Sequence, residues 1–179
     1  MRKAVLALCV AAPLAACGET EQEADATRAA ASFYGIVLGE RTSGVPDVDM
    51  RARLRPVISP DLDSLLAQAA EAERRHAERV NNEEPPYMQG DIFTSLFEGA
   101  TGYEVTGCDE KSEILIECEV QLAHDAEEPV QWKDRVLLAA APTDPKTFLV
   151  DDIAYGGDWD FASKGTLKEA LRAVIAAEE

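Results

Sequence analysis

The side chains with the greatest chemical potential lie near the end of the chain. The stretch FLVDDIAYGGDWDF, Phe148–Phe161, holds four aspartates, two glycines, a tyrosine and a tryptophan. Converging carboxylates could bind a metal ion, but neighbouring side chains in a strand point to opposite faces, which separates Asp151 from Asp152, and EF-hand spacing is absent. Gly156 and Gly157 would permit backbone angles that other residues resist. The pattern favours a structural corner, with ligand contact and a metal site as alternatives.

A second carboxylate is predicted to point into the core. Alternation over Val130–Ala140 places Trp132, Asp134 and Val136 on one face. An inward carboxylate is costly unless it is hydrogen-bonded or paired. Asp134 is therefore either a ligand-binding or acid–base group, or an acceptor for loop amides or for a tyrosine or tryptophan. The second role is favoured.

Histidine is the usual acid–base residue near neutral pH, and the chain has two, His76 and His124. His76 falls on or beside the apolar stripe of a predicted helix and has no partner motif nearby, which favours a packed, hydrogen-bonded side chain. His124 lies in the polar turn AHDAEE. The motifs GxSxG, HExxH, GxxxxGK and GxGxxG are missing. We expect no cofactor and no catalysis; the alternative is a small enzyme with Asp134 or His76 as its base.

Helical spacing of apolar residues locates the elements that precede these groups. It predicts a helix from Asp25 to Leu38, ended by Gly39, and a second from about Pro60 to Asn81. Ser59 can cap the second helix, and proline suits its first position. A Pro-Pro pair then predicts a long ordered loop through residue 97.

After this loop the period changes to alternation, which predicts four strands: Tyr103–Gly107, Ile114–Leu122, Val130–Ala140 and Thr147–Tyr155. Opposite charges are expected to meet across neighbouring antiparallel strands: Glu117 and Glu119 on one, Lys133 and Arg135 on the next. Thr166 and Glu169 form a capping-box pattern that starts a last helix. The order of the elements, with helices first, strands next and a helix last, predicts an α+β domain. In such a domain the helices pack on an antiparallel sheet of about four strands.

The first residues have the order of a secretory signal. Arg2 and Lys3 precede an apolar run from Ala4 to Ala12, and small residues complete the segment 1–16. The run is shorter than the roughly 20 apolar residues that a spanning helix needs.

The residues Leu14-Ala15-Ala16-Cys17 resemble a bacterial lipobox, which implies cleavage before Cys17 and a lipid on its sulfur. An ordinary secretory peptide with an incidental cysteine is the alternative. Gly18, where Asp would signal retention, favours the outer membrane by resemblance to Gram-negative sorting rules, with the protein facing the periplasm. Residues 17–24 are then the lipidated cysteine and a short acidic tether, and residues 25–179 form one domain.

The net charge of −17 excludes one class of partner. An acidic surface repels phosphate backbones, whereas nucleic-acid-binding proteins carry a basic footprint. Solubility explains the acidity most simply, and docking of a basic protein partner is the alternative.

Two cysteines remain after Cys9 leaves with the signal and Cys17 takes the lipid. In an oxidising compartment Cys108 and Cys118 are expected to form a disulfide. A tight hairpin that turned at residues 109–112 would not place them opposite each other, so the bridge requires a wider loop or a shifted register. Two buried thiols are the alternative, and the spacing is not that of CxxC chemistry.

Several stretches, in this order, resemble a family of bacterial envelope lipoproteins that carry a domain of unknown function: ASFYGIVLG (31–39), LRPVISPDLDSLL (54–66), GDIFTS (90–95), WKDRVLL (132–138) and FLVDDIAYGGDWDFASKGTLKEAL (148–171). The resemblance implies a cystatin-like fold similar to nuclear transport factor 2, a cone of curved antiparallel sheet wrapped on helices. It implies a location and a fold, and no activity.

A cone of this kind encloses a pocket, and its enzymes usually place an Asp–His or Tyr–Asp–His set there. The candidate pocket residues in this chain are Tyr34, Tyr87, Asp91, Trp132, Asp134, Asp152, Tyr155 and Trp159. The leading hypothesis is a non-catalytic, membrane-anchored lipoprotein that binds a periplasmic protein or a small ligand. A small enzyme, or an immunity or inhibitor protein against a basic toxin, are the alternatives.

Overall fold

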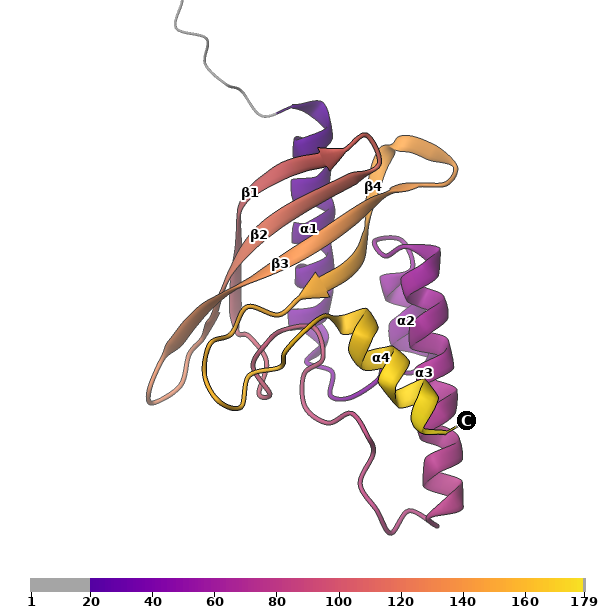
Figure 1. The fold of residues 1–179 in the computed structure, drawn as a ribbon. Coiled ribbons are helices and arrows are strands. Elements are labelled where there is room, and N and C mark those ends of the chain that lie inside the picture. Colours follow the sequence, from indigo (N-terminus) through magenta and orange to yellow (C-terminus); the bar gives the residue numbers. More distant parts are fainter. Residues whose placement is uncertain (1–19, 179) are drawn as a thin grey trace, which may run out of the picture.

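The structure of the protein, a computed structural model, describes residues 20–178. The predicted signal peptide, Cys17 and the start of the predicted tether lie outside these residues. The elements follow in this order: α1 (Glu21–Glu40), α2 (Val48–Leu54), α3 (Pro60–Arg79), β1 (Gly102–Ser112), β2 (Leu115–His124), β3 (Val130–Ala141), β4 (Asp144–Ala154) and α4 (Leu167–Ala177). The predicted α+β class and the C-terminal helix are confirmed (Figure 1).

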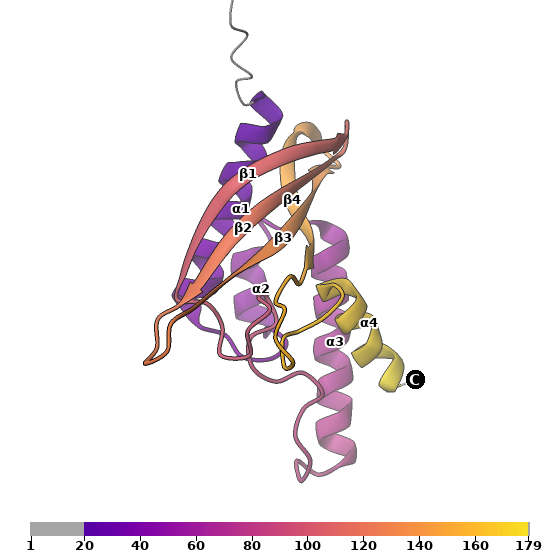
Figure 2. The ribbon, with the colours of Figure 1, turned by 60° about the vertical axis from the view of Figure 1, so that its left-hand side comes forward.

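The four strands form one antiparallel sheet in the order β1-β2-β3-β4. Helix α1 contacts both edge strands, β1 and β4, because the sheet curves around it. Helices α3 and α4 pack against each other beside the end of β4 (Figures 1 and 2). This arrangement agrees with the predicted cone.

The core lies between the concave face of the sheet and α1. Alternate residues of β2, Ile116, Cys118, Val120 and Leu122, are fully buried. They face the helical stripe that contains Ala26, Ala30, Phe33 and Val37. Each large apolar side chain that is fully buried stabilises the fold by about 1.5–3 kcal/mol.

The charge pairs predicted for the outer face of the sheet are also present. The Nζ atom of Lys133 lies 2.6 Å from a Glu119 carboxylate oxygen, and a guanidinium nitrogen of Arg135 lies 3.6 Å from Glu117. These side chains are half-buried or exposed, so each pair contributes only tenths of a kcal/mol. The pairs nevertheless agree with the register in which β2 pairs with β3.

Helix α1 begins at Glu21, not at Asp25, so part of the predicted tether is helical. Thr20 is the N-cap and Glu23 completes a capping box, a T-x-x-E pattern that is visible in the sequence but was not used in the prediction. The Thr20 hydroxyl also donates a hydrogen bond of 2.9 Å to Glu110 of β1. The first turn of α1 is therefore fixed to the sheet.

A short helix, for which no element was predicted, lies between the first two predicted helices. Helix α2 begins after Asp47, whose side chain accepts a hydrogen bond from the backbone N–H of Met50. With seven residues it is too short to show helical periodicity, but it buries Met50 and Leu54 against the core. Helix α3 ends at Arg79, slightly before its predicted end.

The predicted end of the first strand, Gly107, was too early. Strand β1 continues to Ser112, which pairs with Leu115, so the turn lies beyond residues 109–112. Cys108 is consequently directly opposite Cys118, and the two form a disulfide. The shifted register that a bridge requires is thus present.

Strand β4 contains a bulge at its two aspartates. Leu137 pairs with Asp152 and Leu138 pairs with Val150, which leaves Asp151 without a residue opposite it. The bulge breaks the alternation that was expected to separate Asp151 from Asp152. Both carboxylates instead reach the same residue of α4, Lys168.

Candidate functional site

Asp134 is fully buried, and its carboxylate is saturated with hydrogen bonds. It accepts from the backbone N–H of Ser95 at 2.8 Å, from the Ser95 hydroxyl, from the indole N–H of Trp132 at 3.1 Å and from the backbone N–H of Gly156 at 2.8 Å. These are the loop-amide and tryptophan contacts of the favoured prediction. Asp134 therefore joins the loop before β1 to the end of β4.

The glycine pair after β4 is required by close approach. A Cβ atom on Gly156 would lie 2.0 Å from the carbonyl oxygen of Lys133, and one on Gly157 would lie 2.7 Å from the Trp159 ring. Neither glycine is among those with positive φ, so the predicted need for unusual backbone angles was wrong. The Gly157 N–H donates to the Ser95 hydroxyl at 3.0 Å, which closes the corner.

Lys168 fixes the start of α4 to β4 and to the start of α3. Its side chain is 8% exposed, and its Nζ atom lies 2.6 Å from Asp61 and 2.7 Å from Asp151. Burial lowers the pKa of Lys168, but the hydrogen bonds to Asp151 and Asp61 outweigh it and raise the pKa. The backbone N–H of Lys168 donates to Asp152 at 2.9 Å. Neither sequence motif nor spacing had indicated this residue.

A groove of about 470 Å³ lies between α4 and the loop that precedes β1. One wall is a stripe of α4, Ala170, Ala173, Val174 and Ala177; the other wall and the ends include Tyr87, Met88, Asp91, Ile92, Tyr155 and Lys164. We call it the α4 groove. Its volume is within the usual range for small-molecule sites.

Three of the predicted pocket residues, Tyr87, Asp91 and Tyr155, line the α4 groove. The others do not: Tyr34, Trp132 and Asp134 are buried in packing, Trp159 packs edge-on against Trp132, and Asp152 receives the N–H of Lys168. Three of the eight predicted pocket residues therefore line the groove, and the other five lie outside its lining.

Asp91 is the half-buried carboxylate of the α4 groove. One of its oxygens accepts from the backbone N–H of Phe93 at 3.0 Å and the other from the Thr94 hydroxyl at 2.5 Å. Burial raises the pKa of Asp91 to about 6, since it outweighs these hydrogen bonds, and the nearby charge of Asp134 adds to the effect. Asp91 therefore changes charge near neutral pH.

Two tyrosines surround this carboxylate. Tyr155 donates a 2.6 Å hydrogen bond to the carbonyl oxygen of Ile92, and burial, followed by the charges of Asp91 and Asp134, raises its pKa well above the ordinary value. Tyr34 is fully buried, and its hydroxyl has no hydrogen-bond partner among residues 20–178. Burial and the same two carboxylates raise its pKa as well. Both phenols stay protonated at physiological pH.

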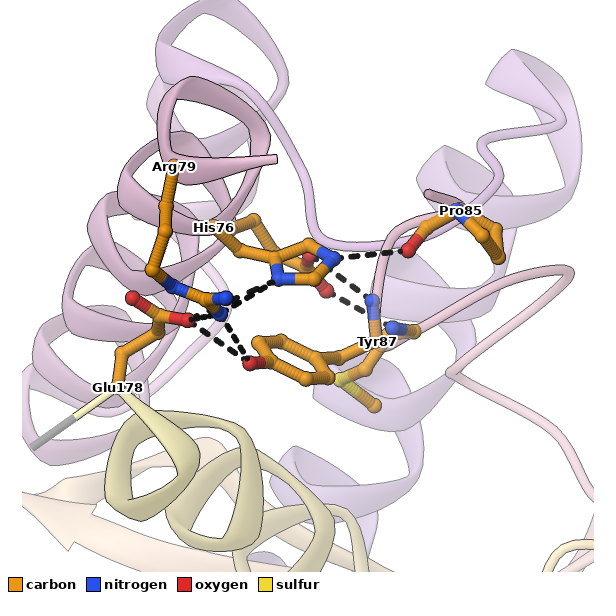
Figure 3. Close-up of polar contacts among 7 residues, drawn as sticks. His76, Arg79, Pro85, Tyr87 and Glu178 are labelled. Carbon is orange, nitrogen blue, oxygen red and sulfur yellow. Dashed lines mark hydrogen bonds and ion pairs between the residues drawn. The ribbon is translucent and has the colours of Figure 1, made fainter. Parts of the chain in front are cut away.

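A polar cluster adjoins the α4 groove through Tyr87, and its side chains are His76, Arg79, Tyr87 and Glu178 (Figure 3). We call it the Glu178 cluster. The Tyr87 hydroxyl donates to Glu178 at 2.8 Å and accepts from Arg79 at 3.1 Å, while Arg79 also binds Glu178 directly. The His76 ring lies 4.2 Å from the Tyr87 ring, centroid to centroid. The cluster thereby joins the end of α3, the loop and the end of α4.

Both ring nitrogens of His76 are engaged in this cluster. Nε2 lies 3.0 Å from the carbonyl oxygen of Pro85 and Nδ1 lies 3.0 Å from an Arg79 nitrogen. Since a carbonyl only accepts and a guanidinium only donates, Nε2 carries the proton and Nδ1 accepts. His76 is thus the packed, hydrogen-bonded side chain that was predicted. His124 contacts the carbonyl oxygen of Gly99 at 2.7 Å through Nδ1.

A larger groove of about 790 Å³ lies on the other side of the same loop, against α3, and contains none of the predicted pocket residues. Among residues 20–178 there is no group of three or more His, Cys, Asp or Glu side chains suited to a metal ion. Within the same part of the chain no helix has both the length and the apolar character needed to cross a bilayer.

Comparison with family models, curated proteins and solved structures found no match to the chain.

Proposed function

We propose that the protein is a non-catalytic lipoprotein of the bacterial envelope, anchored through Cys17, that binds a small amphipathic ligand in the α4 groove. The observation that carries the proposal is the groove itself. It combines an apolar helix stripe with a few polar groups, Asp91, Tyr155 and Lys164, at defined positions. Concave sites of this composition are typical of small-molecule binding.

The position of the groove relative to the predicted anchor supports this function. Only Gly18 and Glu19 separate Cys17 from Thr20, the N-cap of α1. Helix α1 has 20 residues and spans about 30 Å. Asp91 shares a small cavity with residues at the far end of this helix, Val37 and Leu38. A protein anchored at Cys17 would therefore present the α4 groove away from its own membrane.

The contacts of the two proposed bases favour binding over catalysis. Asp134 receives four hydrogen bonds and is fully buried, and His76 has both nitrogens engaged. A small enzyme is the second candidate because Asp91, with a pKa near 6, has the property of a general base at neutral pH. An enzyme would lose all turnover in Asp91→Asn, whereas a binding protein would have none to lose.

Two experiments test the proposal. Cells that express the full chain and incorporate an alkyne-labelled fatty acid should label the wild type and not Cys17→Ala; equal labelling of both would refute the anchor. For the groove, we expect fragments of a hydrophobic library to shift NMR signals of Ala173 and Ala177. Ala173→Glu should abolish these shifts, and Ala176→Glu, an equally exposed alanine of α4 outside the groove lining, should not. Equal effects of the two variants would argue against the groove.

A further inference from the structure

We propose that the α4 groove selects an organic cation, a primary amine with a hydrophobic body whose ammonium group binds the carboxylate of Asp91. This inference rests on the proposed function and specifies the chemistry of its ligand. It depends on three features: the apolar wall, the free acceptor capacity of Asp91, and the negative charge of Asp134 near that carboxylate.

The wall formed by α4 accepts a hydrocarbon group. Its residues recur at intervals of three and four, which places their side chains on one face of the helix. Three of the four are alanines, and Ala173 and Ala177 are exposed to the groove and to solvent. Covering such methyl groups with a hydrocarbon body is favourable by about 25 cal/mol per Å² of apolar surface.

The carboxylate of Asp91 has acceptor positions left for a ligand. An ionised carboxylate offers about four lone-pair sites, and the Phe93 N–H and the Thr94 hydroxyl occupy one on each oxygen. Both contacts come from the residues that follow Asp91 in the chain. They hold the carboxylate in place, and Asp91 is among the residues that line the α4 groove.

The ionisable groups around Asp91 carry both signs, but the charge that shifts its pKa is negative. Tyr87, Tyr155 and Lys164 line the groove with Asp91, and Arg41, Glu98 and His124 line the adjoining small cavity with it. Tyr34 of α1 and Asp134 of β3 also interact with it electrostatically. The charge of Asp134 acts on Asp91 strongly enough to contribute to its raised pKa. A half-buried carboxylate with a like charge nearby is stabilised most by a cation.

Lys164 does not provide this cation. Its ammonium donates to the carbonyl oxygens of Gly157 at 2.7 Å and Trp159 at 3.3 Å, so it caps the corner after β4. An anionic ligand would have to compete with these contacts and would meet the charges of Asp91 and Asp134. A neutral alcohol could donate one hydrogen bond to Asp91 but would not neutralise it.

The test uses the full-length protein, purified from envelopes in detergent, and three probes with similar bodies: 2-phenylethylamine, 2-phenylethanol and 3-phenylpropionate. Calorimetry at pH 7 should give an affinity for the amine at least tenfold higher than for the alcohol or the acid. Between pH 7 and pH 5 the amine affinity should fall roughly tenfold, because protonation of a carboxyl with a pKa of about 6 removes its charge. The carbon-13 titration of Asp91 should shift to lower pH when the amine is added.

Asp91→Asn should bind amine and alcohol equally and without pH dependence, and Asp158→Asn, an exposed aspartate outside the groove lining, should behave as wild type. Equal binding of amine and alcohol by wild type, tightest binding of the acid, or an unchanged Asp91 titration would overturn the cation inference and leave the proposed function standing. Failure of all three probes would also overturn it, while the Ala173→Glu and Ala176→Glu comparison decides the proposed function separately.

Discussion

Removal of the Asp134 carboxylate provides the most direct test of the structural reasoning. In Asp134→Ala, four hydrogen bonds to a fully buried group disappear. The Ser95 hydroxyl can rotate, and the Gly156 N–H retains a contact of 3.1 Å with that hydroxyl. The backbone N–H of Ser95 and the indole N–H of Trp132 would be left without an acceptor.

The size of the effect follows from these two donors. A buried donor without a partner costs about 1–3 kcal/mol, so two of them predict a loss of about 4 kcal/mol in the free energy of unfolding. Domains of this kind are stable by about 5–15 kcal/mol in total. With a urea dependence of about 2 kcal/mol per molar, the midpoint of unfolding should fall by about 2 M. Asp134→Asn keeps one acceptor oxygen and should lose about half as much.

Urea unfolding at pH 7.5, followed by far-UV circular dichroism and tryptophan emission, measures this loss. The chain has two tryptophans, and their rings pack together at a centroid distance of 5.8 Å, so emission reports directly on the corner. Asp158→Asn replaces an exposed aspartate nearby and should change the free energy by less than about 0.5 kcal/mol. A midpoint for Asp134→Ala within about 0.3 M of the parent would refute the role assigned to Asp134.

Three further predictions concern the disulfide, a titrating carboxyl and a buried ion pair. Cys108→Ser should lower the free energy of unfolding by about 3 kcal/mol, and a reducing agent should do the same to the parent and nothing to the variant. The pKa of Asp91 rises from 3.8 to about 6 on folding, so the folded state binds the extra proton and is stabilised as the pH falls through this range. Between pH 7 and pH 4 the parent should therefore gain about 2 kcal/mol relative to Asp91→Asn in urea unfolding, and a constant difference would contradict the assignment. Lys168→Met should cost about 2 kcal/mol, since it leaves Asp151 half-buried without its cation; an unchanged urea midpoint would show that the pair is dispensable.

Patterns that depend on neighbouring residues were predicted correctly from the sequence. The alternation of β2 and β3, the N-cap of α3 at Ser59 and the capping box at Thr166 each rest on contacts within a few positions. The cross-strand ion pairs of Lys133 and Arg135 could be predicted because charged residues alternate with buried residues along both strands. In each case the local pattern and the tertiary fold require the same conformation.

Two errors in the sheet occurred where the pairing partner decides the conformation. The bulge at Asp151 is set by the register of β4 against β3, and the extension of β1 to Ser112 is set by its pairing with β2. Asp134 was recognised as inward-facing, but its main partner, Ser95, lies 39 residues away and no spacing rule relates the two. The same limitation applies to Lys168, whose acidic partners come from α3 and β4.

The effect of Asp91 on stability and its proposed role in ligand binding both depend on the free energy of ionising its buried carboxyl. Without a ligand, the ionised carboxylate at neutral pH is a cost to the fold, because burial and the charge of Asp134 both disfavour it. Replacement by a neutral amide should therefore stabilise the empty protein at pH 7 while it removes the proposed amine site. A ligand that binds only the folded state stabilises that state by an amount that rises with the ligand concentration. A cation bound at Asp91 would therefore offset the free energy that ionisation of the buried carboxyl costs. Both outcomes together would assign the carboxylate of Asp91 to ligand binding and not to stability of the empty fold.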